Sequence, residues 1–152
     1  MRSERSSAAR RQSGSSGSLD PEVCLAHFDA PLGTVAGATA ALRRYGAAWE
    51  ACDPGGAAAL FSADAAYYWT PFSPPKRGQA EIARAWSAAT SRQREIRFRF
   101  RVLSFEARSG IAQWRTRLVR TTLGREVEID GILLAEFDAA GLCRVFREWW
   151  HS

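Results

Sequence analysis

The second half of the chain carries an alternating pattern that is typical of β-strands. From Ile96 to Val102, apolar side chains alternate with arginines. Successive side chains of a strand point to opposite faces, so this segment predicts a half-buried strand with its arginines turned outward. Three further strand segments, 111–121, 126–137 and 142–151, follow across glycine-containing turns. The succession predicts an antiparallel four-stranded meander.

The first half of the chain shows helical spacing instead. Between Ala38 and Cys52, apolar residues recur at three- and four-residue steps, which indicates a helix with one apolar stripe. A short helix over 57–61, an aromatic strand over 67–72 and a third helix over 78–91 follow. This order predicts an α+β domain (α-α-β-α-β-β-β-β), in which three N-terminal helices pack in the concave face of a curved, mostly antiparallel sheet.

Residues 1–33 lack either period and are rich in Ser, Gly and Arg over most of their length. They predict a disordered N-terminal arm in front of one domain over 34–152. Residues 1–18 hold four arginines and one glutamate, so they carry +3 of the formal charge of +5 and leave +2 for the rest. The basic balance is therefore weak evidence for a nucleic-acid partner.

Several functional classes lack their sequence signatures. No apolar run approaches the roughly 18 residues that a membrane span needs, and no signal-peptide core is present. The three cysteines are far apart, and neither His27 nor His151 has a metal-ligand neighbour at helical spacing. We therefore expect a cytoplasmic protein with reduced thiols, no metal, no cofactor, and neither a membrane nor a nucleic-acid partner.

The last predicted strand carries the most informative polar residue. Alternation places Glu148 on the same face as Phe146 and Trp150. A carboxylate among large rings must be paired, hydrogen-bonded or protonated, because burial of a bare charge costs several kcal/mol or more. Such a setting is found in many small-ligand sites, and it makes Glu148 the first candidate for a functional residue.

Short motifs outside the arm follow one another in a distinctive order and spacing. They are Tyr45, Trp49, Asp53, the run 60–65, Pro71-Phe72, Arg77-Gly78, Ile82, Trp86, Phe137-Asp138, Gly141 and the run 146–150. Together they resemble the nuclear transport factor 2-like superfamily, and within it the SnoaL-like group of small cone-shaped domains. The resemblance covers nearly all of the chain after the arm.

The resemblance implies an apolar pocket between sheet and helices, and a homodimer formed through the outer face of the sheet. We expect the arginines of the 96–102 strand to meet acidic residues of the 126–137 strand in the partner subunit. Among these acids, Asp130 could face the pocket instead of the outer face of the sheet. A β-bulge at Gly131 would turn it inward and add a second acid to the pocket.

One catalytic branch of the superfamily, the steroid isomerases, is matched only in part. Its tyrosine of the first helix is kept here as Tyr45. Its two aspartates correspond to Thr70 and Leu133, so the resemblance supplies neither the base nor the second half of the oxyanion hole. This departure argues against steroid-isomerase chemistry.

A second branch, the limonene epoxide hydrolases, is also matched in part. It joins an arginine on a middle strand, an aspartate two residues later and an acid on the last strand. Arg115 and Glu148 match the first and third of these, whereas Arg117 replaces the aspartate. With one carboxylate where that mechanism needs two, epoxide hydrolysis lacks support.

Arg115, Glu148 and Tyr45 are the candidate catalytic residues. Strand parity can place Arg115 and Glu148 on the concave face within bidentate reach, with Glu148 binding or deprotonating a ligand. Tyr45 would offer a hydroxyl to the same cavity, with Gln113 as a neighbour. The alternatives are a structural ion pair at the mouth of the cone and a Tyr45 that only packs helix against sheet.

The candidate ligand-binding residues are mostly aromatic and could equally form the core. They are Trp49, Trp69, Phe72, Trp86, Phe98, Gln113, Phe146 and Trp150. The sequence therefore predicts a domain that binds a small apolar molecule, with cofactor-free acid–base catalysis left open. The alternatives are an enzyme similar to polyketide cyclases or epoxide hydrolases, and a non-catalytic dimeric interaction subunit. A cavity of roughly several hundred cubic ångströms would speak against that last alternative.

Overall fold

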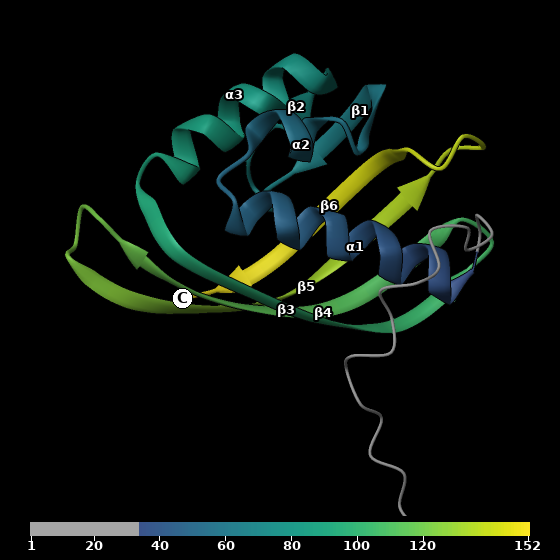
Figure 1. The fold of residues 1–152 in the computed structure, drawn as a ribbon. Helices are drawn as coiled ribbons and strands as arrows, with labels where there is room; N and C mark the ends of the chain where they lie inside the picture. Colours follow the sequence, from purple (N-terminus) through teal and green to yellow (C-terminus); the bar gives the residue numbers. More distant parts are fainter. Residues whose placement is uncertain (1–33) are drawn as a thin grey trace, which may run out of the picture.

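Three helices lie over one face of a curved six-stranded sheet in the computed structural model, which describes residues 34–152 (Figure 1). The predicted arm, 1–33, lies outside the described residues. The predicted α+β cone is confirmed. Within 34–152, no helix is long and apolar enough to cross a membrane.

Two of the three helices begin at short polar side chains that cap them. Helix α1 (Val35–Glu50) starts after Thr34, whose hydroxyl accepts the amide of Gly37 at 3.1 Å. Helix α2 (Pro54–Ala58) follows Asp53, whose side chain accepts the amide of Gly56, and its proline occupies the first turn, where no amide donor is needed. Helix α3 (Gly78–Thr90) has no side-chain cap at its start. The cap at Asp53 starts α2 three residues before the predicted position.

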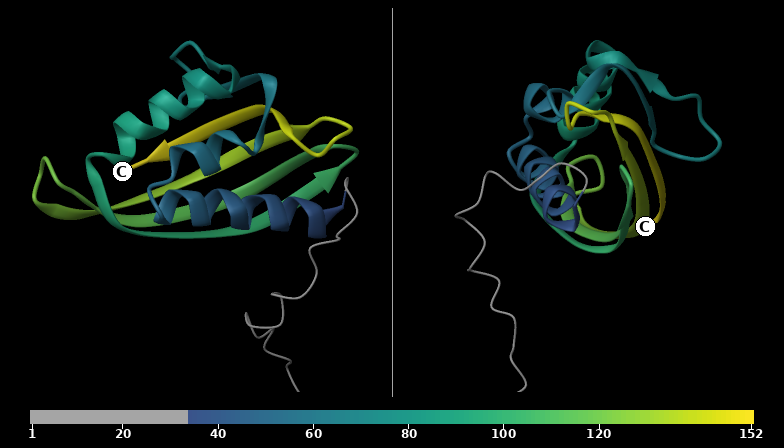
Figure 2. Two further views of the ribbon diagram at one scale, coloured as in Figure 1. Left: turned by 45° about the horizontal axis from the view of Figure 1, so that its top comes forward. Right: turned by 90° about the vertical axis from the view of Figure 1, so that its right-hand side faces the viewer.

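The sheet has the strand order β2-β1-β6-β5-β4-β3, and only the β1–β6 pair is parallel. The last four strands form the meander that the alternating pattern predicts. Figure 2 shows how they curl around the space beneath the helices. The strands are β1 (Phe61–Tyr68), β2 (Lys76–Arg77), β3 (Gln93–Glu106), β4 (Ser109–Arg120), β5 (Arg125–Phe137) and β6 (Cys143–His151).

The first strand differs from its prediction. The sequence predicts a helix over 57–61 and a strand over 67–72, but the strand already begins at Phe61 and ends at Tyr68. Ser62 and Asp64 near its beginning are typical of a turn, which is why the sequence predicts one there. The pairing of β1 with β6 is irregular at the same place, where the register shifts between Phe61 and Ala66. The segment after Tyr68 contains three prolines, which cannot donate to a ladder. The two-residue strand β2 is missing from the prediction altogether.

Alternation assigns the two faces of the meander. On β4, Trp114, Thr116 and Leu118 are buried on the concave face, whereas Arg115 and Arg117 are exposed on the outer face. The arginines of β3 are exposed too, as predicted; they are Arg97, Arg99 and Arg101. The outer face is therefore rich in cations and the concave face is apolar.

The acids of β5 pair within the chain rather than being left free for a partner. Arg115 Nη2 lies 2.7 Å from Asp130 Oδ2, and Arg117 Nε lies 2.7 Å from Glu128 Oε2. Cross-strand register brings these residues together, because Arg115 is opposite Asp130 and Arg117 is opposite Glu128. Both pairs are largely exposed, so solvent screens them and each contributes little to stability.

Gly131 does not form the bulge that would have turned Asp130 inward. The β4–β5 register runs without a shift through this position, and Asp130 stays on the outer face. The glycine serves close packing instead. A Cβ there would lie 2.5 Å from the carbonyl oxygen of Trp149 and 3.1 Å from Trp114. Only a residue without a side chain leaves room here for both the backbone of β6 and the indole of Trp114.

Candidate functional site

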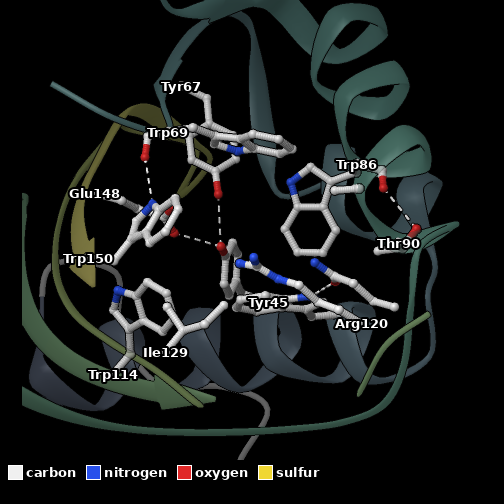
Figure 3. A pocket seen from close by; sticks show the side chains of 13 residues that line it. Tyr45, Tyr67, Trp69, Trp86, Thr90, Trp114, Arg120, Ile129, Glu148 and Trp150 are labelled. Atoms are coloured by element: carbon white, nitrogen blue, oxygen red, sulfur yellow. Dashed lines mark hydrogen bonds between the residues drawn. The ribbon is translucent and has the colours of Figure 1, made fainter. Parts of the chain in front are cut away.

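A small cavity lies between α1, α3 and the concave face of the sheet (Figure 3). Its volume is about 120 Å³. This is smaller than the several hundred cubic ångströms that would have argued against a packed core, and smaller than ordinary drug-sized pockets. Thirteen residues line it: Tyr45, Trp49, Tyr67, Trp69, Trp86, Ala89, Thr90, Gln93, Trp114, Arg120, Ile129, Glu148 and Trp150.

A buried carboxyl and two tyrosine hydroxyls meet at one side of this cavity. The hydroxyl of Tyr45, from α1, donates to Glu148 Oε1 at 2.9 Å. The hydroxyl of Tyr67, from β1, lies 2.9 Å from the hydroxyl of Tyr45. Figure 3 shows Tyr45 in the middle of this row, between the acid and the second tyrosine. Three elements far apart in the sequence thus build one hydrogen-bonded group.

The single proton of each hydroxyl sets the direction of this row. Since Tyr45 gives its proton to Glu148, Tyr67 must give its own proton to the oxygen of Tyr45. If Glu148 becomes protonated, its own O–H can donate to Tyr45 and the row can reverse. The group can therefore take up or release one proton at Glu148 while every oxygen keeps a partner.

Burial controls the protonation of this group. It raises the pKa of Glu148 from 4.5 to about 7, and the hydroxyl of Tyr45, with that of Tyr67 behind it, opposes that rise by stabilising the charged form. Burial and the nearby Glu148 also raise the pKa of both tyrosines well above 10. Near neutral pH the tyrosines thus stay neutral donors, while Glu148 is divided between its two forms.

Three tryptophans of the cavity wall have buried indole N–H groups without a hydrogen-bond partner. The indole N–H groups of Trp86 and Trp114 are buried and have no partner, and both side chains are almost fully buried. Trp69 Nε1 has no hydrogen-bond partner either. Buried donors usually find an acceptor, so each unpaired N–H costs about 1–3 kcal/mol.

The expected pair between Arg115 and Glu148 is not formed. Arg115 lies on the outer face, where Asp130 and Glu128 hold it, while Glu148 is 6% exposed on the concave face. The physical reason is strand parity: neighbours of the buried Trp114 must point outward. Gln113 shares that outer parity and hydrogen-bonds to Arg101 at 3.3 Å, so it is not a neighbour of Tyr45.

The aromatic candidates divide into three groups. Phe72 is 96% exposed in the loop after β1, so it does not line the pocket. Phe98 and Phe146 do not line the cavity. They pack against the ring of Tyr45 at ring-centroid distances of 5.5 Å and 5.2 Å. The remaining candidates lie on the cavity wall: Trp49, Trp69, Trp86 and Trp150.

Several residues of the site were not predicted from the sequence. Tyr67 shares strand parity with the candidate Trp69, and Trp114 belongs to the apolar face of its strand, so the pattern carried a signal for both. Arg120 ends the same apolar parity on β4, where a cation looks like a surface residue. The other missed lining residues are Ala89, Thr90, Gln93 and Ile129.

The described part of the chain holds no group of three acids, cysteines or histidines that could bind a metal ion. Glu148 is opposite the buried Leu133 in the β5–β6 ladder, which places it on the concave face. It is the acid that β6 contributes to the cavity. No second carboxylate lines it among residues 34–152. Such an arrangement can bind a small molecule, exchange one proton with it and donate hydrogen bonds to it.

Replacing Tyr45 by phenylalanine is expected to lower the free energy of unfolding by about 2 kcal/mol at pH 8. The change leaves a buried, ionised Glu148 and the buried hydroxyl of Tyr67 without their common partner. Urea unfolding measures the loss, which should shrink near pH 5, where Glu148 is neutral. Tyr68→Phe is the control, because Tyr68 lies half-buried outside this group and stacks under Arg147. Equal effects of the two substitutions would contradict the role given to the Tyr45 hydroxyl.

Comparisons with known proteins agree with this fold. A family model described as a SnoaL-like domain matches residues 42–145. No curated protein matches the chain. Among 315 matching chains of solved structures is a proposed polyketide cyclase from Xanthomonas campestris pv. campestris, with 18% identity and a TM-score of 0.66. The match covers 76% of this chain and 90% of that one, and at such low identity it shows a shared fold.

Proposed function

This chain belongs to the family of SnoaL-like domains, and from that premise we propose that its cavity binds a small, largely apolar molecule about the size of one six-membered ring. Glu148 and Tyr45 are its polar contacts on one side. The observation that carries the proposal is a titratable carboxyl, buried at 6% exposure, on the wall of a cavity lined by five tryptophans. A core that only had to pack would not keep an acid there, because its burial is costly.

The size of the cavity limits the ligand. An apolar cavity of about 150 Å³ accommodates benzene, and this one measures about 120 Å³. Its walls are mostly aromatic, which favours flat apolar ligands through offset and edge-to-face contacts. A single ring therefore fits, whereas a fused polycyclic molecule would require the tryptophans to move.

Two neighbouring alanines of α3 provide a test of where the ligand binds. Ala89 lines the cavity, whereas Ala88 is exposed on the same helix. Ala89→Leu would fill part of the cavity and should weaken binding of benzyl alcohol by about tenfold or more, since displacing even a modest contact of ~1.4 kcal/mol has that effect. Ala88→Leu should bind as the unchanged protein does. Quenching of tryptophan fluorescence at pH 7 reports both affinities.

The results of that titration bear directly on the proposal. Saturable binding that Ala89→Leu weakens and Ala88→Leu leaves unchanged supports a ligand in this cavity. No saturable response of the unchanged protein, or equal affinities of the two variants, contradicts it. Circular dichroism of both variants shows whether the helix is retained, so a loss of binding through unfolding is recognised.

A second candidate function is acid–base catalysis without a cofactor. It is favoured by the pKa of Glu148, which lies at about 7 and lets one carboxyl act as base and then as acid at neutral pH. The reactions in question are isomerisation, cyclisation or hydration of a small molecule. The polyketide-cyclase-like enzyme remains a candidate on this ground. The epoxide-hydrolase-like enzyme loses support, because its arginine corresponds to Arg115 on the outer face.

The homodimer and the cytoplasmic location that the sequence analysis predicts stay predictions. The intrachain pairs of Arg115 and Arg117 already neutralise Asp130 and Glu128, two of the acids that were expected to meet arginines of a partner. An association through the outer face would instead use its exposed apolar side chains, Ile132 and Trp149, which are opposite each other in the β5–β6 ladder. The oligomeric state measured by analytical ultracentrifugation decides this point.

A further inference from the structure

Arg120 lines the cavity although no acid accounts for its presence there. It continues the concave parity of β4 beyond Leu118 and is half-buried. It enters from the end of the strand, on the side of Trp86 and Thr90, whereas Glu148 enters from β6 on the other side (Figure 3). Within residues 34–152, no carboxylate forms an ion pair with Arg120, unlike Arg115 and Arg117 on the outer face of the same strand.

The cross-strand neighbours of Arg120 supply no negative charge either. They are Gln93 on β3 and Arg125 on β5. The side-chain oxygen of Gln93 accepts the indole N–H of Trp49 at 2.8 Å, which leaves its amide nitrogen as a donor. This side of the cavity therefore combines a guanidinium with an amide N–H₂. We call these two groups the donor side.

A set of donors without acceptors is suited to one kind of ligand group. The guanidinium presents parallel N–H groups in a planar fork that matches the two oxygens of a carboxylate. The acceptors on the opposite side belong to Glu148 and the tyrosines, and these are already joined to each other. A bound oxyanion would give the donors partners that the described residues of the protein do not provide.

We propose that the natural ligand is a monocyclic carboxylic acid whose carboxylate binds to Arg120 while its ring lies between the tryptophans. The proposal deepens the function proposed above and depends on it, because it names the chemical class bound in the same cavity. Arg120 selects for the acid and orients it, so that the part of the ring opposite the carboxylate lies toward Glu148. It is a specificity-determining residue rather than a proton-transfer group.

The test compares two probes of similar size, benzoate and benzyl alcohol, at about pH 6, where benzoate is charged. Arg120→Gln keeps hydrogen-bond donors but loses the charge. Arg125→Gln is the matched control, since it removes the same charge from the opposite residue, which does not line the cavity. Affinities come from tryptophan fluorescence, and melting temperatures show whether each variant is folded.

We expect the unchanged protein and Arg125→Gln to bind benzoate at least about tenfold more tightly than Arg120→Gln does, because a charge-assisted contact is lost. All three should bind benzyl alcohol alike. Benzoate affinity that does not change in Arg120→Gln, or that falls equally in Arg125→Gln, would overturn the inference. So would equal weakening of both probes in a folded Arg120→Gln.

The unchanged protein gives a second readout that needs no variant. The ratio of benzoate to benzyl alcohol affinity should fall as sodium chloride is raised, because salt screens a partly exposed charge pair. A ratio that does not depend on salt contradicts a contact with Arg120. If benzyl alcohol binds and benzoate does not, only this inference fails. If neither probe binds, the proposed function fails with it.

Discussion

Replacing Glu148 by glutamine should stabilise the protein by about 3 kcal/mol at pH 8 and leave its stability nearly unchanged at pH 4. The reason is the cost of ionising a buried acid. Folding raises the pKa of Glu148 from 4.5 to about 7, mainly through burial. Below about pH 4.5 the carboxyl is neutral in both the folded and the unfolded state, so it does not change the free energy of unfolding. Above pH 7 the folded protein must keep the charge in an apolar setting.

The sign of this effect follows from proton binding. Between pH 4.5 and 7 the folded state holds the proton of Glu148 while the unfolded state releases it, so stability falls as the pH rises through this range. Above pH 7 this loss of stability is complete. Glutamine carries no charge and therefore avoids it. The amide oxygen of the glutamine can still accept the hydroxyl of Tyr45.

Urea unfolding of the two proteins at a series of pH values measures this difference. Glu126→Gln is the control, because Glu126 is an exposed glutamate of β5 and loses the same charge. The Glu148 variant should separate from the unchanged protein between pH 4.5 and 7, whereas the Glu126 variant should follow it throughout. A Glu148 variant that is less stable at pH 8 would show that the ionised carboxylate is bound by groups that compensate for its burial.

The same substitution should reduce proton exchange of a ring ketone by at least about a hundredfold, the usual contribution of a general acid–base group. Cyclohexanone fits a cavity of about 120 Å³. In heavy water, ionised Glu148 would take a proton from the carbon beside the carbonyl, which leaves an enolate. The acid, after exchange with solvent, would return a deuteron to that carbon. One C–H bond breaks and one C–D bond forms, so nothing else is consumed.

Proton nuclear magnetic resonance follows the loss of the ketone signal. The rate should rise as the pH increases through about 7, because the base is the ionised form of Glu148. Glu126→Gln again serves as the control and should exchange as the unchanged protein does. Exchange that persists in Glu148→Gln would contradict the role given to this carboxyl, and exchange that is no faster than in buffer would leave the site with binding alone. The titration with benzyl alcohol then decides whether that remaining function holds.

Much of the fold was predictable because its information is local. A period of two over 96–102 and its continuation in three hairpins specify strands, and a period of 3.6 before them specifies helices. Parity also placed the arginines of β3 on the outer face. It would have placed Arg115 there too, since it alternates with the buried Trp114 and Thr116. The predicted concave position of Arg115 assumed the opposite parity on this strand, in line with the partial match to the epoxide hydrolases, and it was wrong.

Periodicity along the chain was enough to predict the class of the fold, the outer face of the β3 arginines and the aromatic setting of Glu148. It could not predict that Tyr45 from α1 and Tyr67 from β1 reach this acid, or that Arg120 stands across the cavity from it, because these contacts exist only in the packed structure. The reason is that face and period depend on neighbours in the chain. A pKa, an unpaired donor and the volume of a cavity depend on distances between residues remote in sequence, which the packing of helices against the curved sheet sets.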